Sequence, residues 1–165
     1  MKKLSVLFSA SLLIICLVGC HFKEKRAKQY RDTILQSVQV VIDSSLDYGD
    51  ALQSYERARA LQSHQKYSAL VNSTLTKIEG MKDFEGDTTL QVFSKELLVF
   101  YKNTLDNEIN PFLQSVKGEA FSPEETLVAD SLMIKLTMSE NQYWERFNWA
   151  EKKFYKEEKI ATVEK

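Results

Sequence analysis

Residues 122–159 read SPEETLVADSLMIKLTMSENQYWERFNWAEKKFYKEEK and contain no glycine and a single proline, at position 123. Ser122 suits the N-cap of a helix, with Pro123 at the first helical position and Glu125 placed to complete a capping box. Mostly apolar residues then recur at steps of three and four, which puts them on one helical face. The stretch therefore predicts one long amphipathic helix. That face consists of Leu132, Leu136, Ser139, Tyr143, Phe147, Ala150 and Phe154.

Two further helical segments are predicted before it, over residues 50–81 and 88–117. The later half of the first has the heptad-like spacing of a bundle seam, formed by Tyr67, Val71, Thr74, Ile78 and Met81. The second has a wide apolar face, formed by Leu90, Phe93, Leu97, Phe100, Tyr101, Leu105, Ile109, Phe112 and Val116. Pro111 lies inside this second segment and has no N–H to bond to the carbonyl of Asn107, so a kink is predicted there.

The earliest helical segment of the mature chain is predicted over residues 23–44, where Tyr30, Ile34, Val38 and Val41 share one face. Residues 43–45 and 49–50 are aspartate, serine and glycine, which favour helix ends and turns, so a break is predicted there. The periodic face nevertheless continues through Ser45, Tyr48, Leu52 and Tyr55. A single long bent helix is therefore the alternative.

These segments together predict an all-α fold, an up-and-down bundle of three to four long antiparallel helices. The chain has only 5 glycines and 2 prolines, which fits long helices rather than many turns. Residues 20–165 are long enough for a single domain with a sizeable core.

The first twenty residues have the layout of a secretory signal peptide. Lys2 and Lys3 precede an apolar run over residues 4–18, which is shorter than the roughly 20 residues that span a bilayer. The run ends in Leu17-Val18-Gly19-Cys20, which resembles the lipobox of bacterial lipoproteins. An ordinary signal peptide and an uncleaved signal anchor are the alternatives.

The lipobox resemblance implies cleavage after Gly19, removal of residues 1–19 as a signal peptide, and lipidation of Cys20. Two or three acyl chains on one residue give a lasting anchor, whereas one chain binds a membrane only marginally. His21 follows Cys20, so the aspartate that retains such proteins in the inner membrane is absent. The resemblance therefore implies a bacterial cell-envelope protein anchored in a membrane, and it favours the outer membrane or the cell surface.

The composition restricts the classes of partner and of site. Without Lys2 and Lys3, 20 of the 22 basic residues remain beside 23 acidic residues, and no long block of positive charge indicates nucleic acid. Apart from Cys20, the mature chain has no cysteine, so no intramolecular disulfide is expected.

Motifs for catalysis, metals or cofactors are absent, and we expect no enzyme activity and no cofactor. The two histidines, His21 and His64, lack the Glu-x-x-His pattern of a di-iron bundle. His64 is expected to be structural, with an axial ligand role beside Met133 or Met138 as the alternative. Carboxylates are scattered at helix-surface spacing, as at Glu96, Asp106, Glu108, Glu140 and Glu145.

Aromatic residues are concentrated between positions 143 and 155. They do not all share one helical face, because Trp144, Trp149 and Tyr155 lie off the face predicted for the core. One interpretation is that the helix buries two faces. The other is that these three residues form a patch for a partner, since tryptophan and tyrosine are enriched at protein interfaces.

Residues Phe147-Asn148-Trp149-Ala150-Glu151-Lys152-Lys153-Phe154 are similar to the closing helix of uncharacterised helical-bundle surface lipoproteins of Gram-negative bacteria, and residues 55–81 resemble that group more weakly. The resemblance implies fold and location and carries no catalytic residues. We therefore expect a membrane-anchored binding or scaffold protein with an envelope protein as its partner. A carrier of a small apolar ligand or metal inside the bundle is the alternative.

Overall fold

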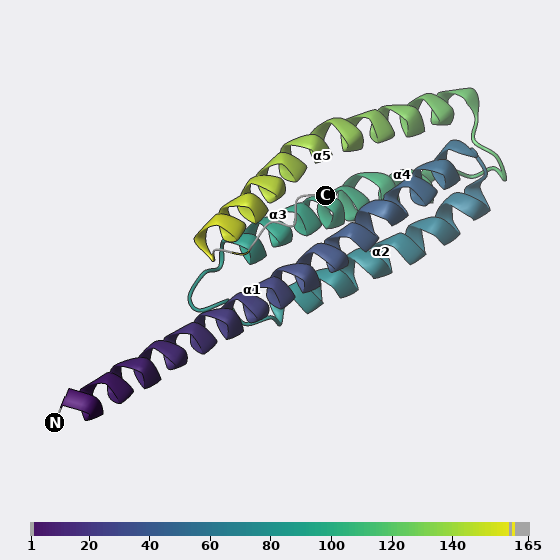
Figure 1. Cartoon of the computed structure of the whole chain (residues 1–165). Helices are drawn as coiled ribbons and strands as arrows, with labels where there is room; N and C mark the ends of the chain where they lie inside the picture. Colours follow the sequence, from purple (N-terminus) through teal and green to yellow (C-terminus); the bar gives the residue numbers. More distant parts are fainter. Residues whose placement is uncertain (1, 159, 161–165) are drawn as a thin grey trace.

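The computed structural model describes residues 2–158 and 160, with side chains from Phe22 onward in that range. Its elements are α1 (Lys2–Gln53), α2 (Arg57–Glu79), α3 (Thr89–Thr104), η1 (Leu105–Ile109), α4 (Asn110–Ser115) and α5 (Pro123–Glu157). The segments α3, η1 and α4 follow one another without a break, so the chain forms four rods that alternate in direction (Figure 1). The predicted all-α, up-and-down bundle is confirmed.

The two ends of the bundle are made by different parts of the chain. The α1–α2 link and the start of α5 lie at one end, which we call the distal end (Figure 1). The α2–α3 link and the end of α5 lie at the other, proximal end, beyond which the first turns of α1 project. Within the described residues, no helix is both long enough and apolar enough to cross a bilayer.

The predicted helical faces form the core. Within α5, the buried members of the predicted face are Leu136, Phe147, Ala150 and Phe154. The seam predicted on α2 is buried at Tyr67, Val71, Thr74 and Ile78. Side chains from all four rods therefore meet in one hydrophobic core.

The predicted break at residues 43–50 is wrong, because α1 continues through it to Gln53. The polar side chains that suggested a helix end bond back to their own helix instead. The hydroxyl of Ser44 donates to the carbonyl of Val40 at 2.8 Å, and that of Ser45 donates to the carbonyl of Ile42 at 2.7 Å. Serines whose hydroxyls bond to carbonyls of the preceding turn do not interrupt a helix.

The chain turns at residues 54–56 instead. Tyr55 adopts a φ of 55°, which is uncommon for a residue other than glycine. Its carbonyl accepts a bond from the N–H of Phe121 at 2.8 Å, and its hydroxyl donates to Asp130 at 3.0 Å. Contacts with distant parts of the chain thus hold a turn that the local sequence does not predict.

Near Pro111, where the sequence predicts a kink, the helix contains a π-helical turn, η1, which ends two residues before the proline. The N–H of Asn110 donates to the carbonyl of Leu105, five residues earlier. Leu105 and Ile109 remain buried in the core. The widened turn therefore accommodates the proline without ending the rod.

Gly49 marks a close approach between α1 and α5, because a Cβ there would lie 3.1 Å from the terminal methyl of Met133. We expect Gly49→Ala to raise the free energy of unfolding by about 0.5–1 kcal/mol, since alanine is the better helix former and the end of a methionine side chain can move. Urea denaturation measures the change.

Gly118→Ala is the matched control for that measurement. A Cβ at Gly118 would lie 2.8 Å from the backbone carbonyl oxygen of Ala120, so this substitution should lower the stability by about 1–3 kcal/mol. A clear loss of stability in Gly49→Ala would show that Met133 cannot yield.

Candidate binding surface

His64 belongs to a buried aromatic cluster rather than to an open site. Its Nδ1 lies 3.0 Å from the hydroxyl of Tyr48, and its Nε2 lies 3.5 Å from the hydroxyl of Ser68. Tyr48 stacks on Tyr67 with ring centroids 4.9 Å apart, and Tyr67 meets the ring of Tyr101 edge-on at 6.1 Å. Both imidazole nitrogens of His64 therefore have partners from the protein.

Burial raises the pKa of the Tyr48, Tyr67 and Tyr101 hydroxyls well above their ordinary value. The three phenols are thus neutral at physiological pH. Tyr101 also donates a hydrogen bond to Glu140 at the edge of the core. The cluster consequently joins α1, α2, α3 and α5 through rings and neutral hydroxyls.

His64 should make stability depend on pH. Burial lowers its pKa below the ordinary value of 6.5, and the negative charge of Asp106 opposes this only in part. The folded state therefore binds fewer protons than the unfolded state just below pH 6.5, and its stability falls as the pH drops through that window. Urea denaturation at pH 5.5 and 7.5 should show this loss, and His64→Gln should show a smaller one. Equal losses in the two proteins would contradict a buried neutral His64.

The carboxylates singled out in the sequence are not brought together. Glu96 pairs with Arg146 at 2.7 Å, Glu108 pairs with Lys135 at 2.6 Å, and Asp106 pairs with Lys102. Glu140 accepts from Tyr101, and Glu145 is exposed. No group of three or more metal-binding side chains occurs within the described residues. The predicted cleavage site after Gly19 and the predicted lipidation site, the side chain of Cys20, lie outside the part of the chain whose side chains the structure describes.

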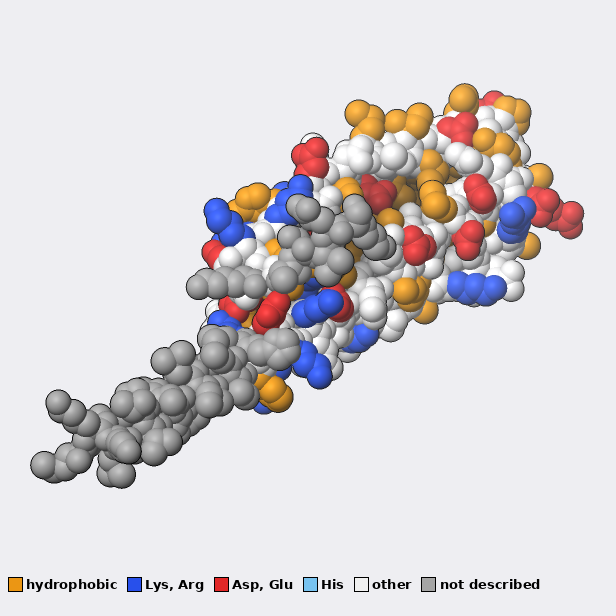
Figure 2. Space-filling model, viewed as in Figure 1, with side chains coloured by type: hydrophobic (Ala, Val, Ile, Leu, Met, Phe, Trp, Pro, Cys, Tyr) orange, Lys and Arg blue, Asp and Glu red, His pale blue; other side chains and the backbone are white. Residues whose placement is uncertain are grey.

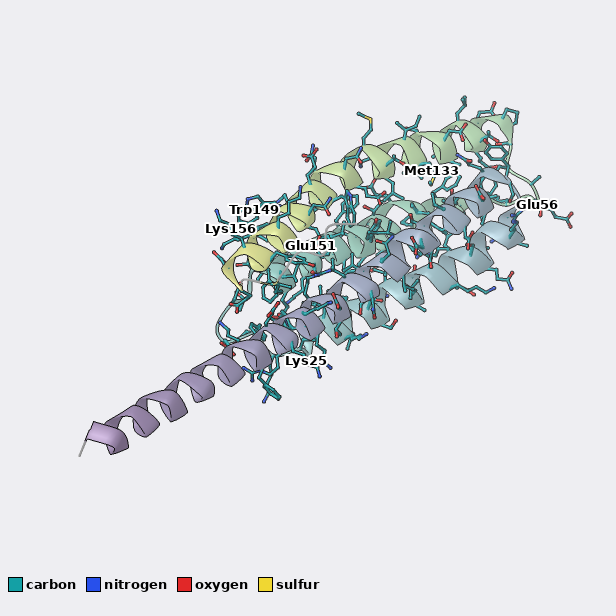
Figure 3. The ribbon with its side chains drawn as sticks, in the orientation of Figure 1. Lys25, Glu56, Met133, Trp149, Glu151 and Lys156 are labelled. Carbon is teal, nitrogen blue, oxygen red and sulfur yellow. The ribbon has the colours of Figure 1, made fainter. Side chains whose placement is uncertain are left out.

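The three predicted patch residues lie on two different sides of α5. Trp149 is 54% exposed and meets Phe93 of α3 edge-on at 5.6 Å. Trp144 is half-buried and lines a groove beside α1, and the ring of Tyr155 stacks on Arg31 of α1 at 4.2 Å. Figure 3 shows Trp149 on the outer side of α5 and Glu151 on the side toward α1. These aromatic residues therefore do not form a single surface.

Two grooves lie between α1 and α5. Ion pairs join the two helices at the proximal end, where Lys23 lies 2.7 Å from Glu158 and Arg31 lies 3.5 Å from Glu151. A groove of about 560 Å³ lies between Arg31 and Trp144. The second groove, of about 610 Å³, lies toward the distal end.

This second groove, the distal groove, is lined by Gln53 at the end of α1, by Tyr55, and by Asp130, Met133, Ile134, Thr137 and Met138 of α5. Met133 lies between α5 and α1 in Figure 3. Ile134 is 61% exposed and Met138 is 68% exposed, so large apolar side chains face solvent at its edge. The groove is therefore accessible, with polar residues in its lining and an exposed apolar edge.

Exposed apolar residues continue on both sides of the distal groove. Leu127 of α5 is 70% exposed, and its spacing of seven from Ile134 places both on one line of the helix. Leu46 of α1, one turn before Gly49, is 74% exposed. Figure 2 shows hydrophobic side chains along the α5 ridge toward the distal end. Most apolar surface of a soluble helix faces the core, so this line is unusual.

The sequence interpretation missed these residues because it followed the dense aromatic run. A signal was present, since Leu127, Ile134 and Met138 recur at steps of seven and four on the side of the helix away from the predicted core face.

Comparisons of the chain with models of protein families, with curated proteins and with solved structures gave no match.

Proposed function

We propose that this protein is a lipid-anchored component of a bacterial cell envelope that binds another envelope protein and is not an enzyme. The lipobox-like sequence ending at Cys20 supports the anchor. The observation that carries the binding role is the exposed apolar surface around the distal groove, formed by Leu46, Leu127, Ile134 and Met138. This surface lies at the end of the bundle away from the start of α1, where a partner can reach it.

The anchor is tested by mass spectrometry of protein extracted from its own membranes. We expect a chain of residues 20–165 carrying acyl groups, and we expect Cys20→Ala to abolish both cleavage after Gly19 and acylation. An unmodified full-length chain in the parent protein would refute the anchor. Outer-membrane retention is checked on the same samples by membrane fractionation.

The binding role is tested by photo-crosslinking in intact cells. A photoreactive residue at Met138 should capture an envelope protein, whereas the same residue at Lys66, which is exposed on α2, should not. Loss of the adduct in Ile134→Asp would show that the apolar surface makes the contact. Repeated failure to capture any protein from Met138 would refute the binding role.

A further inference from the structure

The distal halves of α1 and α5 carry an unusual excess of negative charge. Residues 32–53 of α1 contain four aspartates and no lysine or arginine, and residues 123–145 of α5 contain five carboxylates and one lysine. That lysine, Lys135, pairs with Glu108 of η1 and so turns away from α1. Both helices that border the distal groove are therefore acidic.

Most of these carboxylates are not neutralised by the protein. Among the described residues, Asp32 is the one member of the set of nine that forms an ion pair, with the neighbouring Arg31. Asp43, Asp47 and Asp50 are exposed, and their spacing of four and three places them on one line of α1. This line runs beside Leu46. Figure 2 shows acidic side chains among the hydrophobic ones on this part of the surface.

The other basic residues of α1 and α5 lie outside these two stretches, and the nearest are Arg31 and Arg146. Lys23 and Arg26 of α1 pair at the proximal end with Glu158 and Glu85, which belong to the end of α5 and to the α2–α3 link. These proximal charges contribute to intramolecular pairs, whereas Asp43, Asp47 and Asp50 of α1 face solvent. Like charges repel, so the exposed aspartates of α1 disfavour an acidic segment as the occupant of the neighbouring groove.

We propose that the distal groove binds a basic amphipathic helix of the partner protein. Its apolar face would cover Ile134, Met138 and Leu46, and its lysine or arginine residues would lie against the aspartates of α1. An apolar groove between two helices is a recurrent docking site for an amphipathic helix, and flexible methionine side chains adapt well to such a ligand. The acidic border supplies the charge complementarity that selects a basic helix.

This inference rests on the proposed binding role and is tested separately with a defined probe. The full processed protein, in neutral detergent, carries a photoreactive residue at Met138 or, as the control, at Lys66. The probes are an 18-residue helical peptide with leucine on one face and lysine on the other, and its counterpart with glutamate in place of lysine. Crosslinking is titrated against peptide concentration.

We expect the lysine peptide to label the Met138 protein and to leave the Lys66 protein unlabelled. Ile134→Asp should weaken the interaction about tenfold, and Asp47→Lys combined with Asp50→Lys should weaken it about tenfold at low salt. All three positions are exposed, so the variants should fold. Salt at 0.5 M should weaken binding to the parent protein, because it screens exposed charges.

Three results would overturn the inference. The first is equal labelling by the glutamate peptide. The second is a crosslink between Met138 residues of two copies of this chain, which would identify the groove as a self-association surface. The third is a cellular partner captured at Met138 through a segment that is not a basic helix, which would leave the proposed binding role intact. Specific labelling by the lysine peptide without any cellular partner would support the groove chemistry and refute the binding role.

Discussion

Phe154→Ala should lower the free energy of unfolding by about 3–5 kcal/mol, the range observed when a fully buried phenylalanine is truncated. Phe154 is completely buried near the end of α5. Its ring centroid lies 5.6 Å from that of Tyr30 on α1 and 5.7 Å from that of Phe84 in the α2–α3 link. Truncation would leave a cavity among three separate parts of the chain. Urea denaturation measures the decrease in the free energy of unfolding.

Trp149→Ala, one and a half turns earlier on the same helix, is the control. Trp149 is larger than Phe154 but half-exposed, with its main ring contact to Phe93, so its loss should cost about 1 kcal/mol or less. Similar losses in the two variants would contradict the burial described here. They would mean that the end of α5 is packed in a different orientation.

Asp47→Pro should cost about 3 kcal/mol or more, because proline removes a helical hydrogen bond and clashes with the preceding turn. Asp47 lies inside α1 at the place where the sequence alone predicts a break. A proline would be tolerated in a link between two helices but not in a continuous helix. The variant therefore distinguishes the two interpretations.

Asp47→Ala controls for the loss of the carboxylate in that experiment. The side chain is exposed, so we expect a change within about 0.5 kcal/mol. Thermal unfolding followed by circular dichroism measures both variants. If Asp47→Pro were as stable as Asp47→Ala, α1 would end before residue 47.

The parts of the fold that local chemistry determines could be predicted from the sequence. The capping box at the start of α5 is confirmed, with the N–H of Ser122 donating to Glu125 at 2.7 Å and the N–H of Glu125 donating to the hydroxyl of Ser122 at 3.2 Å. The periodic faces are confirmed as core, because apolar side chains at steps of three and four form one stripe that packs against the neighbouring helices.

The turn at residues 54–56 could not be predicted, because distant contacts decide it. Serine and glycine at positions 44, 45 and 49 looked like a helix end, yet the serines bond within α1 and Gly49 makes room for Met133. The actual turn uses Tyr55 with a positive φ, held by Phe121 and Asp130. Neither partner is near Tyr55 in sequence.

The candidate surface was predictable only in part. The exposed line of Leu127, Ile134 and Met138 can be read from helical spacing once the core face of α5 is known. The groove itself depends on how α1 packs against α5, where Gly49 lies close to the methyl group of Met133. The positions of Trp144 and Trp149 on different sides of α5 follow from their spacing of five residues alone.

The unbroken course of α1 has a mechanical consequence. Residues Lys2–Gln53 form one helix, so no loop separates position 20 from the bundle. With a lipid on Cys20, a helix rising about 1.5 Å per residue would hold Leu46 roughly 40 Å from the attachment point. The helix would then fix the distance between the anchor and the binding surface. A partner in the same membrane would have to present its helix at that distance from the lipid attachment point.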